Sequence, residues 1–279
     1  MAEAQRVALA AGALRLCVHQ QRQRMQVGAA LARGPGASLE FHDHRAYLAG
    51  DDLRYLDWGI LARSDQLVIR RHHQEIRPQL TICLDASASM GIDQEKWHLA
   101  RDLAALFAQL AEAAAYRPQL YISKDRWQLL PADCWRRRLE AVEPAGAGGL
   151  QAVPPRFLAG GERIIISDGL CPQGVQSVVA ALAQGAVSLT LLEILSPAEL
   201  HPQACGPVEL QDVEGGSQEV LFDQHAATAY QQRLGQHRQA WQRALAGRGP
   251  GLISCPSEAG WQAALQTLLG RGLVEQRRA

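Results

Sequence analysis

The sequence lacks the features that mark several common classes of protein. Its six cysteines form no CxxC pair and no spacing typical of zinc ligands, which argues against a zinc site or a disulfide framework and fits a reducing compartment. No stretch approaches the roughly 18 apolar residues that span a bilayer. Arg6 and Arg15 interrupt the apolar amino terminus, where a signal peptide would have its core. We therefore expect a soluble, cytoplasmic protein without an integral membrane segment.

An excess of charge of either sign is also missing. Lys+Arg and Asp+Glu both total 28 in 279 residues, so no overall field favours nucleic acid or anionic membranes. Only Lys96 and Lys124 among the basic residues are lysines. The run of arginines at 136–138 is interpreted as the solvated face of a short helix, and nucleic-acid binding is disfavoured.

Alternating strand and helix patterns begin at residue 79. Near-continuous apolar runs at Leu80–Leu84, Ile164–Ile166 and Val187–Ile194 are typical of buried strands, and helical periodicity lies between them. This alternation predicts an α/β fold with a doubly wound, mainly parallel sheet (Rossmann-like), covered by helices on both faces. A further stretch that alternates around Gly215-Gly216 predicts an inserted β-hairpin.

Residues 1–78 predict a lead segment that packs on an α/β domain of residues 79–273. Residues 2–26 carry an apolar stripe at helical spacing and predict one helix. Residues 39–78 are polar and irregular, with one β-like piece at residues 67–69, and we expect tertiary contacts to hold them. Trp58 is expected in the core.

A candidate metal site follows the first predicted strand, in the sequence Asp85-Ala86-Ser87-Ala88-Ser89. One carboxylate and two hydroxyls at alternate positions can converge on Mg²⁺, which prefers oxygen ligands. The strand at 164–166 leads similarly into Asp168, and the carboxyl ends of parallel strands share one edge of the sheet. Two carboxylates there repel unless a cation lies between them, so Asp85, Ser87, Ser89 and Asp168 are the predicted ligands. The alternative is a helix N-terminal cap.

These residues match the metal-ion-dependent adhesion site of von Willebrand factor A domains. Three separated motifs narrow the resemblance to the bacterial domain-of-unknown-function 58 family (DUF58), over about residues 40–270. They are the stretch from Arg45 to Arg70, Leu195–Leu200 and Ala229-Tyr230. The resemblance implies a von Willebrand factor A-like fold and a bound Mg²⁺ (or Mn²⁺ or Ca²⁺). Both serines would coordinate the ion, both aspartates would act directly or through water, and an acidic residue of a partner would complete the shell.

One departure weakens the metal prediction. The family places a threonine after a Gly-Gly pair in a middle loop, but Gly149 is followed here by Leu150, and no Ser or Thr lies between Lys124 and Ile166. Gln151 or water could fill the position. Otherwise the site binds metal weakly, or has lost it and works through its surface alone. Losing one neutral ligand need not abolish binding, since Mg²⁺ commonly keeps several waters.

The resemblance implies a non-enzymatic protein-interaction or adaptor module. It would work beside a MoxR-type AAA+ ATPase, and with other von Willebrand factor A-like proteins, in client remodelling or maturation. The alternative is a Mg²⁺-dependent phosphohydrolase, because carboxylates around a metal also serve that chemistry. The sequence disfavours it, since Ser87 and Ser89 have no neighbouring base and no second aspartate follows Asp85 at i+2.

The family signature also contains Asp51, Asp52, Arg54 and Asp57. These residues could form a binding face. They could instead form Asp–Arg pairs that clamp an irregular segment, and within one sequence this structural interpretation is favoured.

Overall fold

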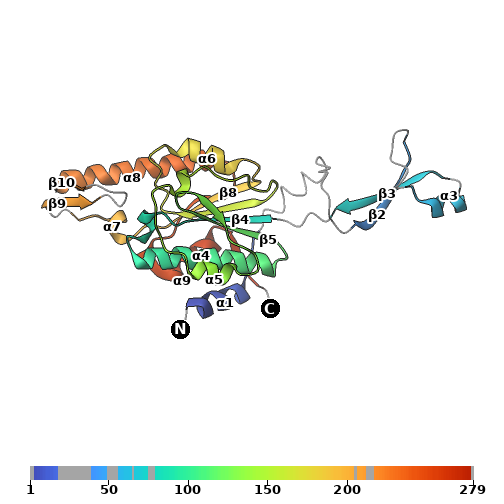
Figure 1. The fold of residues 1–279 in the computed structure, drawn as a ribbon, viewed down its shortest axis with the longest axis horizontal. Helices are drawn as coiled ribbons and strands as arrows, with labels where there is room; N and C mark the ends of the chain where they lie inside the picture. Colours follow the sequence, from blue (N-terminus) through green and yellow to red (C-terminus); the bar gives the residue numbers. More distant parts are fainter. Residues whose placement is uncertain are drawn as a thin grey trace. The chain divides into compact units, whose positions relative to one another are not determined.

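The structure, a computed structural model, describes residues 3–17, 39–48, 56–64, 66–74, 79–203, 206–211 and 217–277. The chain divides into two compact units, residues 1–18 with 78–279 and residues 19–77. Figure 1 shows the helices and strands of both units. Within the described ranges, no helix has both the length and the apolar character needed to cross a bilayer.

A six-stranded sheet forms the centre of the first unit, in the order β11-β8-β7-β4-β5-β6. All neighbouring strands are parallel except β6, which pairs antiparallel with β5 at one edge. The strands are β4 (Gln79–Asp85), β5 (Arg117–Ser123), β6 (Trp127–Leu129), β7 (Glu162–Ser167), β8 (Ser188–Glu193) and β11 (Gly251–Ser254). The predicted mainly parallel sheet is confirmed, and the carboxyl ends of β4 and β7 adjoin because Leu84 lies opposite Ile166.

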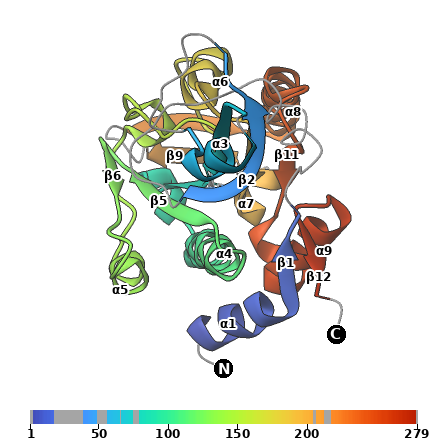
Figure 2. The same cartoon turned by 90° about the vertical axis from the view of Figure 1, so that its right-hand side faces the viewer.

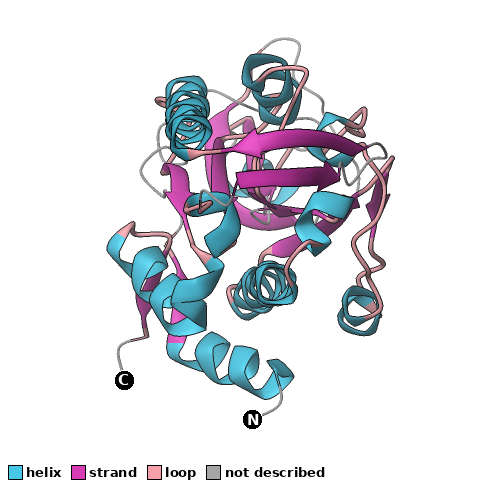
Figure 3. Cartoon of the chain, turned by 90° about the vertical axis from the view of Figure 1, so that its left-hand side faces the viewer, coloured by secondary structure: helices cyan, strands magenta, loops and turns pink. Residues whose placement is uncertain are grey.

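Helices cover both faces of this sheet. Successive side chains of a strand point to opposite faces, and apolar side chains are buried on each of them. In β4, Leu80, Ile82 and Leu84 join one hydrophobic cluster, whereas Cys83 joins the other. The first cluster is filled by α1 (Glu3–Ala13), α4 (Gln94–Ala113), α5 (Trp135–Glu140) and α9 (Gly260–Gly270). The second is filled by α6 (Val175–Ala183) and α8 (Gln224–Leu245). Figures 2 and 3 show these two helical layers from opposite sides.

Two antiparallel strand pairs complete the first unit. β9 (Gly206–Gln211) and β10 (Ser217–Phe222) form the predicted hairpin between α7 (Pro197–Leu200) and α8. β1 (Leu14–Leu16) pairs with β12 (Val274–Gln276). The helix expected over residues 2–26 was therefore wrong at Leu14–Leu16, which form β1, and residues 18–26 fall outside the described residues. Leu14 joins the first hydrophobic cluster from a strand, so pairing with β12 overrides the helical pattern of the sequence.

The second unit contains two antiparallel strands, β2 (Leu39–Ala46) and β3 (Val68–Gln74), and the helix α3 (Trp58–Ser64). Strands of this length correct the expectation of an irregular segment with one short β-like piece. Their sequences are polar at most positions, so hydrophobic periodicity did not reveal them. Trp58 is 63% exposed on α3, which corrects its expected place in the core.

Candidate functional site

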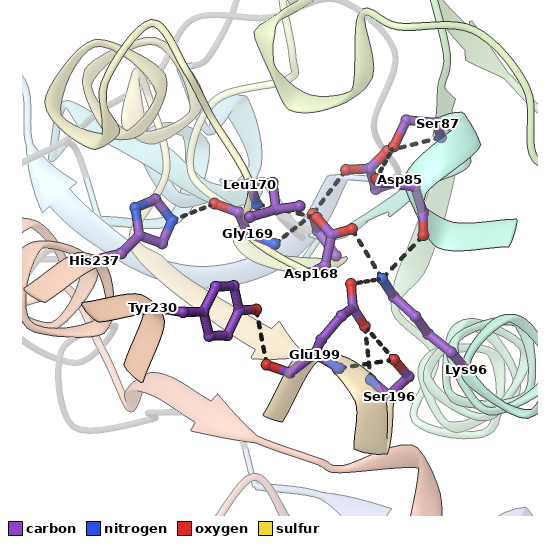
Figure 4. A network of polar contacts seen from close by, with 12 residues as sticks. Asp85, Ser87, Lys96, Asp168, Gly169, Leu170, Ser196, Glu199, Tyr230 and His237 are labelled. Carbon is purple, nitrogen blue, oxygen red and sulfur yellow. Dashed lines mark hydrogen bonds and ion pairs between the residues drawn. The ribbon is translucent and has the colours of Figure 1, made fainter. Parts of the chain in front are cut away.

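The carboxyl ends of β4 and β7 bring the four predicted ligands together on one edge of the sheet, here called the rim. Asp85 is the last residue of β4, and Asp168 follows β7 directly. Ser167, at the end of β7, donates its hydroxyl to Oδ2 of Asp85 at 2.7 Å, which connects the two strand ends. The hydroxyl oxygens of Ser87 and Ser89 lie 3.1 Å apart. Residues from two distant parts of the chain therefore share this rim (Figure 4).

Asp85 is a buried carboxylate that accepts two hydrogen bonds. Its Oδ1 accepts from the backbone N–H of Ser87 at 2.9 Å, and its Oδ2 accepts from Ser167. Burial, followed by the negative charge of Asp168, raises the pKa of Asp85 to about 6. The hydrogen bonds from Ser167 and Ser87 act in the opposite direction. Ionised Asp85 therefore makes the folded state less stable than protonated Asp85 would.

The alternative of a helix cap does not describe these serines. Ser87 precedes the short 3-10 helix η2 (Ala88–Gly91) but makes no side-chain capping bond to it. The long helix α4 is capped by Asp93, whose Oδ1 accepts from the N–H groups of Glu95 and Lys96 at 2.7 and 3.1 Å. The hydroxyls of Ser87 and Ser89 are therefore directed to each other rather than to the beginning of α4.

A cation at this rim is supplied by the chain itself, as the ammonium of Lys96. Its Nζ lies 3.0 Å from Oδ2 of Asp168, 2.7 Å from Oε1 of Glu199 and 3.0 Å from the carbonyl oxygen of Ser89. The Lys96 side chain is 0% exposed, that of Asp168 1% and that of Glu199 16%. Sequence reasoning missed this residue. Its signals were that only one other lysine occurs in the chain and that a lysine stands at the beginning of a predicted apolar helix.

Glu199, also missed from the sequence, reaches Lys96 from α7. A capping box fixes this short helix: the hydroxyl of Ser196 accepts from the N–H of Glu199, and Oε2 of Glu199 accepts from the N–H and hydroxyl of Ser196 at 2.7 and 2.8 Å. The hydroxyl of Tyr230, on α8, donates to the carbonyl oxygen of Glu199 at 2.8 Å. The Ser-x-x-Glu pattern of residues 196–199 is the sequence signal of such a box.

These contacts test whether the four predicted ligands fit a divalent ion. The 3.1 Å between the hydroxyl oxygens of Ser87 and Ser89 suits neighbouring ligands of an octahedral ion, which lie about 2.9 Å apart when each is about 2.1 Å from the metal. Both oxygens of Asp168 already accept a hydrogen bond, Oδ2 from Lys96 and Oδ1 from the N–H of Leu170 at 3.0 Å, so an ion bound directly to this carboxylate would share it with the ammonium. The arrangement is a carboxylate pair, Asp168 and Glu199, bridged by Lys96, and an ion held directly by all four predicted residues would add a second cation to it.

In the middle loop, neither Leu150 nor Gln151 supplies a side-chain oxygen to the rim. Leu150 is buried in the second hydrophobic cluster. The amide oxygen of Gln151, a suggested substitute, accepts from the N–H of Gln173 at 3.1 Å. Gly149 has a φ of +46°, and a Cβ there would lie 3.2 Å from Oδ1 of Asp85. The loop therefore packs its backbone directly against Asp85, which only glycine permits without strain.

The second predicted set lies in the other unit. Asp51, Asp52 and Arg54 fall outside the described residues. Asp57 is buried and caps α3, since its Oδ1 accepts from the N–H groups of Gly59 and Ile60 at 2.9 and 3.1 Å. The N–H of Asp57 donates to the carbonyl of Val68 at 2.9 Å. These bonds give Asp57 a structural role at the junction of α3 and β3.

Helix α8 fixes the loop that carries Asp168. The indole N–H of Trp241 donates to the carbonyl oxygen of Gly169 at 2.9 Å, and Nε2 of His237 lies 2.8 Å from the same oxygen. Gly169 has a φ of +75°, and a Cβ there would lie 3.1 Å from Nε1 of Trp241. Through these contacts and that of Tyr230, α8 holds both loops that bring carboxylates to Lys96.

Three comparisons relate the chain to known proteins. A family model described as "Protein of unknown function DUF58" matches residues 43–240. The uncharacterized protein Rv1480 of Mycobacterium tuberculosis and the uncharacterized protein Mb1516 of Mycobacterium bovis are each 28% identical over 277 residues, covering 92% of this chain and 87% of theirs. The crystal structure of an aerotolerance-related membrane protein from Bacteroides fragilis NCTC 9343 is similar over 69% of this chain and 99% of that chain, with a TM-score of 0.37 and 14% identity. A TM-score this low supports no conclusion about fold.

Proposed function

Since the chain belongs to the DUF58 family, we propose that it is a non-enzymatic protein-interaction module that captures its partner at the rim of Asp85, Ser87, Ser89 and Asp168. The observation that carries this proposal is the convergence of these polar side chains, from separate loops, at the carboxyl ends of β4 and β7. In open α/β sheets this edge is where ligands bind. A von Willebrand factor A-like fold is part of the proposal, and the order of the sheet, with one antiparallel edge strand, is compatible with it.

Exposed apolar side chains on the loops of the rim favour a protein partner. Ile92, between η2 and α4, is 56% exposed; Val153, after the middle-loop 3-10 helix η3 (Gly149–Gln151), is 90% exposed; and Leu170, two residues after Asp168, is 47% exposed. Exposed large apolar side chains on loops that follow a polar site are compatible with a protein-interaction site. A small polar substrate would gain little from them.

The partner that we propose is a MoxR-type AAA+ ATPase, with other von Willebrand factor A-like proteins in the same assembly. The ground for this partner is the family resemblance of the sequence. A cytoplasmic location belongs to the proposal as well, because such a partner requires ATP.

The test is capture of the MoxR-type ATPase from the same genome by the purified, immobilised chain. Val153→Asp places a charge at the most exposed apolar position of the rim loops, and we expect it to weaken binding at least tenfold, about 1.4 kcal/mol. Leu9→Asp is the matched control, because Leu9 is 60% exposed on α1, which contributes no loop to the rim. Equal capture by both variants would contradict the proposed face. Metal-dependent phosphate release that Asp85→Asn abolishes would instead favour the phosphohydrolase alternative.

A further inference from the structure

Lys96 occupies an unusual place for a positive charge. It is in the first turn of α4, two residues inside the helix, where the helix dipole favours negative over positive charge even though Asp93 caps the first N–H groups. Its side chain is also completely removed from water. A lysine is almost never fully buried unless it is paired, so its surroundings must compensate both the burial and the helix end.

Three oxygens provide this compensation, and they come from three separate parts of the chain. An ammonium has three N–H donors, and Lys96 directs them to the carbonyl of Ser89 after β4, to Asp168 after β7 and to Glu199 in α7. Figure 4 shows the carboxylates of Asp168 and Glu199 converging on Nζ. Every donor of the ammonium is therefore satisfied by the loops that form the rim.

This geometry competes with a divalent ion. An ion bound by Ser87, Ser89 and Asp168 would have to share the Asp168 carboxylate with an ammonium 3.0 Å from its Oδ2. Two cations that share one buried carboxylate repel each other strongly. Neither Leu150 nor Gln151 offers the oxygen that the middle loop would need to supply.

We infer that Lys96 is the resident cation of the rim, and that it takes over the charge compensation that a divalent ion would otherwise provide to Asp168. The inference deepens the proposed function, because it makes partner capture at this rim independent of metal. Two carboxylates, Asp168 and Glu199, share one ammonium, and the charge of Asp168 also acts on the buried Asp85. The metal-free rim therefore has no spare positive charge to attract an acidic side chain. Recognition then depends on the hydroxyls and on the surrounding apolar side chains.

The test replaces Lys96 with a neutral side chain of similar length and measures metal binding directly. Calorimetric titration of MnCl₂ and MgCl₂ into the Lys96→Met chain is expected to show at least tenfold tighter binding than the same titration into the wild type. Adding Asp168→Asn to Lys96→Met removes the carboxylate that was paired with the ammonium, and the gain in metal affinity should disappear. An equal affinity of wild type and Lys96→Met for both ions would overturn the inference.

A second variant covers the case in which Lys96→Met does not fold, since it leaves two carboxylates without their cation. Lys96→Met combined with Glu199→Gln removes one positive and one negative charge. It leaves one carboxylate without its cation, whereas Lys96→Met alone leaves two. Its unfolding temperature should rise on addition of MgCl₂ relative to an equal ionic strength of KCl, whereas that of the wild type should not. A rise of the same size in both proteins would refute the role assigned to Lys96.

The partner assay separates this inference from the proposed function. In buffer without nucleotide, where EDTA removes no Mg²⁺ from ATP bound to the partner, capture of the ATPase by the wild-type chain should be unchanged in EDTA if Lys96 is the resident cation. Capture that EDTA abolishes would keep the proposed face and overturn the inference. Absence of capture under all conditions would remove the proposed function, while the titrations of Lys96→Met would still decide the role of the lysine.

Discussion

Replacing Asp85 by Asn should make the stability of the protein less dependent on pH. Asp85 is buried beside Asp168, and its pKa is raised from 3.8 to about 6. A carboxyl that binds its proton more tightly in the folded state contributes stability below its unfolded pKa, and this contribution is lost as the pH rises to the folded pKa. The wild type should therefore lose stability between about pH 4 and pH 6, whereas Asp85→Asn loses nothing through this group.

The size of the effect follows from the two pKa values. A difference of about two pH units corresponds to about 3 kcal/mol, of which some 2–3 kcal/mol falls between pH 4 and pH 7, because the unfolded carboxyl is already half ionised near pH 4. The Asn side chain can still accept the hydrogen bond that the N–H of Ser87 donates to Oδ1. At pH 7 the variant should thus be more stable than the wild type by roughly this amount.

Urea unfolding followed by tryptophan fluorescence, at half-unit steps from pH 4.5 to pH 7.5, measures this difference. All other groups titrate in both proteins, so subtracting the two curves isolates Asp85. Asp133→Asn, which removes an exposed carboxyl, controls for the loss of one negative charge. A difference between wild type and Asp85→Asn that stays constant over this range, or that favours the wild type at pH 7, would refute the electrostatic account of the rim.

Three further substitutions test the supports of the rim by urea unfolding at pH 7. Gly169→Ala should destabilise the protein by roughly 2 kcal/mol, because its φ of +75° disfavours a side chain and the new methyl meets Trp241; an unchanged midpoint would contradict this. Gly235→Ala, in α8 with nothing within 4 Å of the new Cβ, should instead stabilise by about 0.5–1 kcal/mol. Arg238→Met leaves the buried Glu193 without its bidentate partner and should cost about 2 kcal/mol, discounted because Arg238 is 29% exposed. Most of that cost should vanish in the Glu193→Gln background.

The central sheet could be predicted from the sequence because its strands are buried on both faces. Runs such as Leu80–Leu84, interrupted only by Thr81, and Ile164–Ile166 are nearly continuous in apolar residues, and such runs between helices have few alternatives to a parallel sheet. Polar strands gave no such signal. β2 and β3 are rich in His, Arg and Asp, and Leu14–Leu16 continue a helical pattern until pairing with β12 ends it. Strands that are mostly polar, or that continue a helical pattern, are thus the ones that periodicity missed.

Half of the rim could be predicted for a topological reason, and the other half could not. Asp85 and Asp168 follow two apolar strands, so parallel pairing alone requires their proximity. Glu199 lies beyond the next strand, in a four-residue helix whose direction depends on the capping box of Ser196 and on Tyr230. Lys96 is one of several charged residues in the sequence of α4, and the sequence does not state which of them will face three oxygens.

The lysine also changes how the motif itself should be interpreted. Two carboxylates that meet at a strand edge require positive charge, and the prediction of a metal rested on that requirement. The requirement is correct, since burial and the charge of Asp168 together raise the pKa of Asp85. It does not specify the cation, however, because a side chain on the following helix can satisfy it as well as an ion from solution. Oxygen-rich loops at strand ends therefore predict charge compensation, and the nature of the cation has to be established from the residues that face the carboxylates.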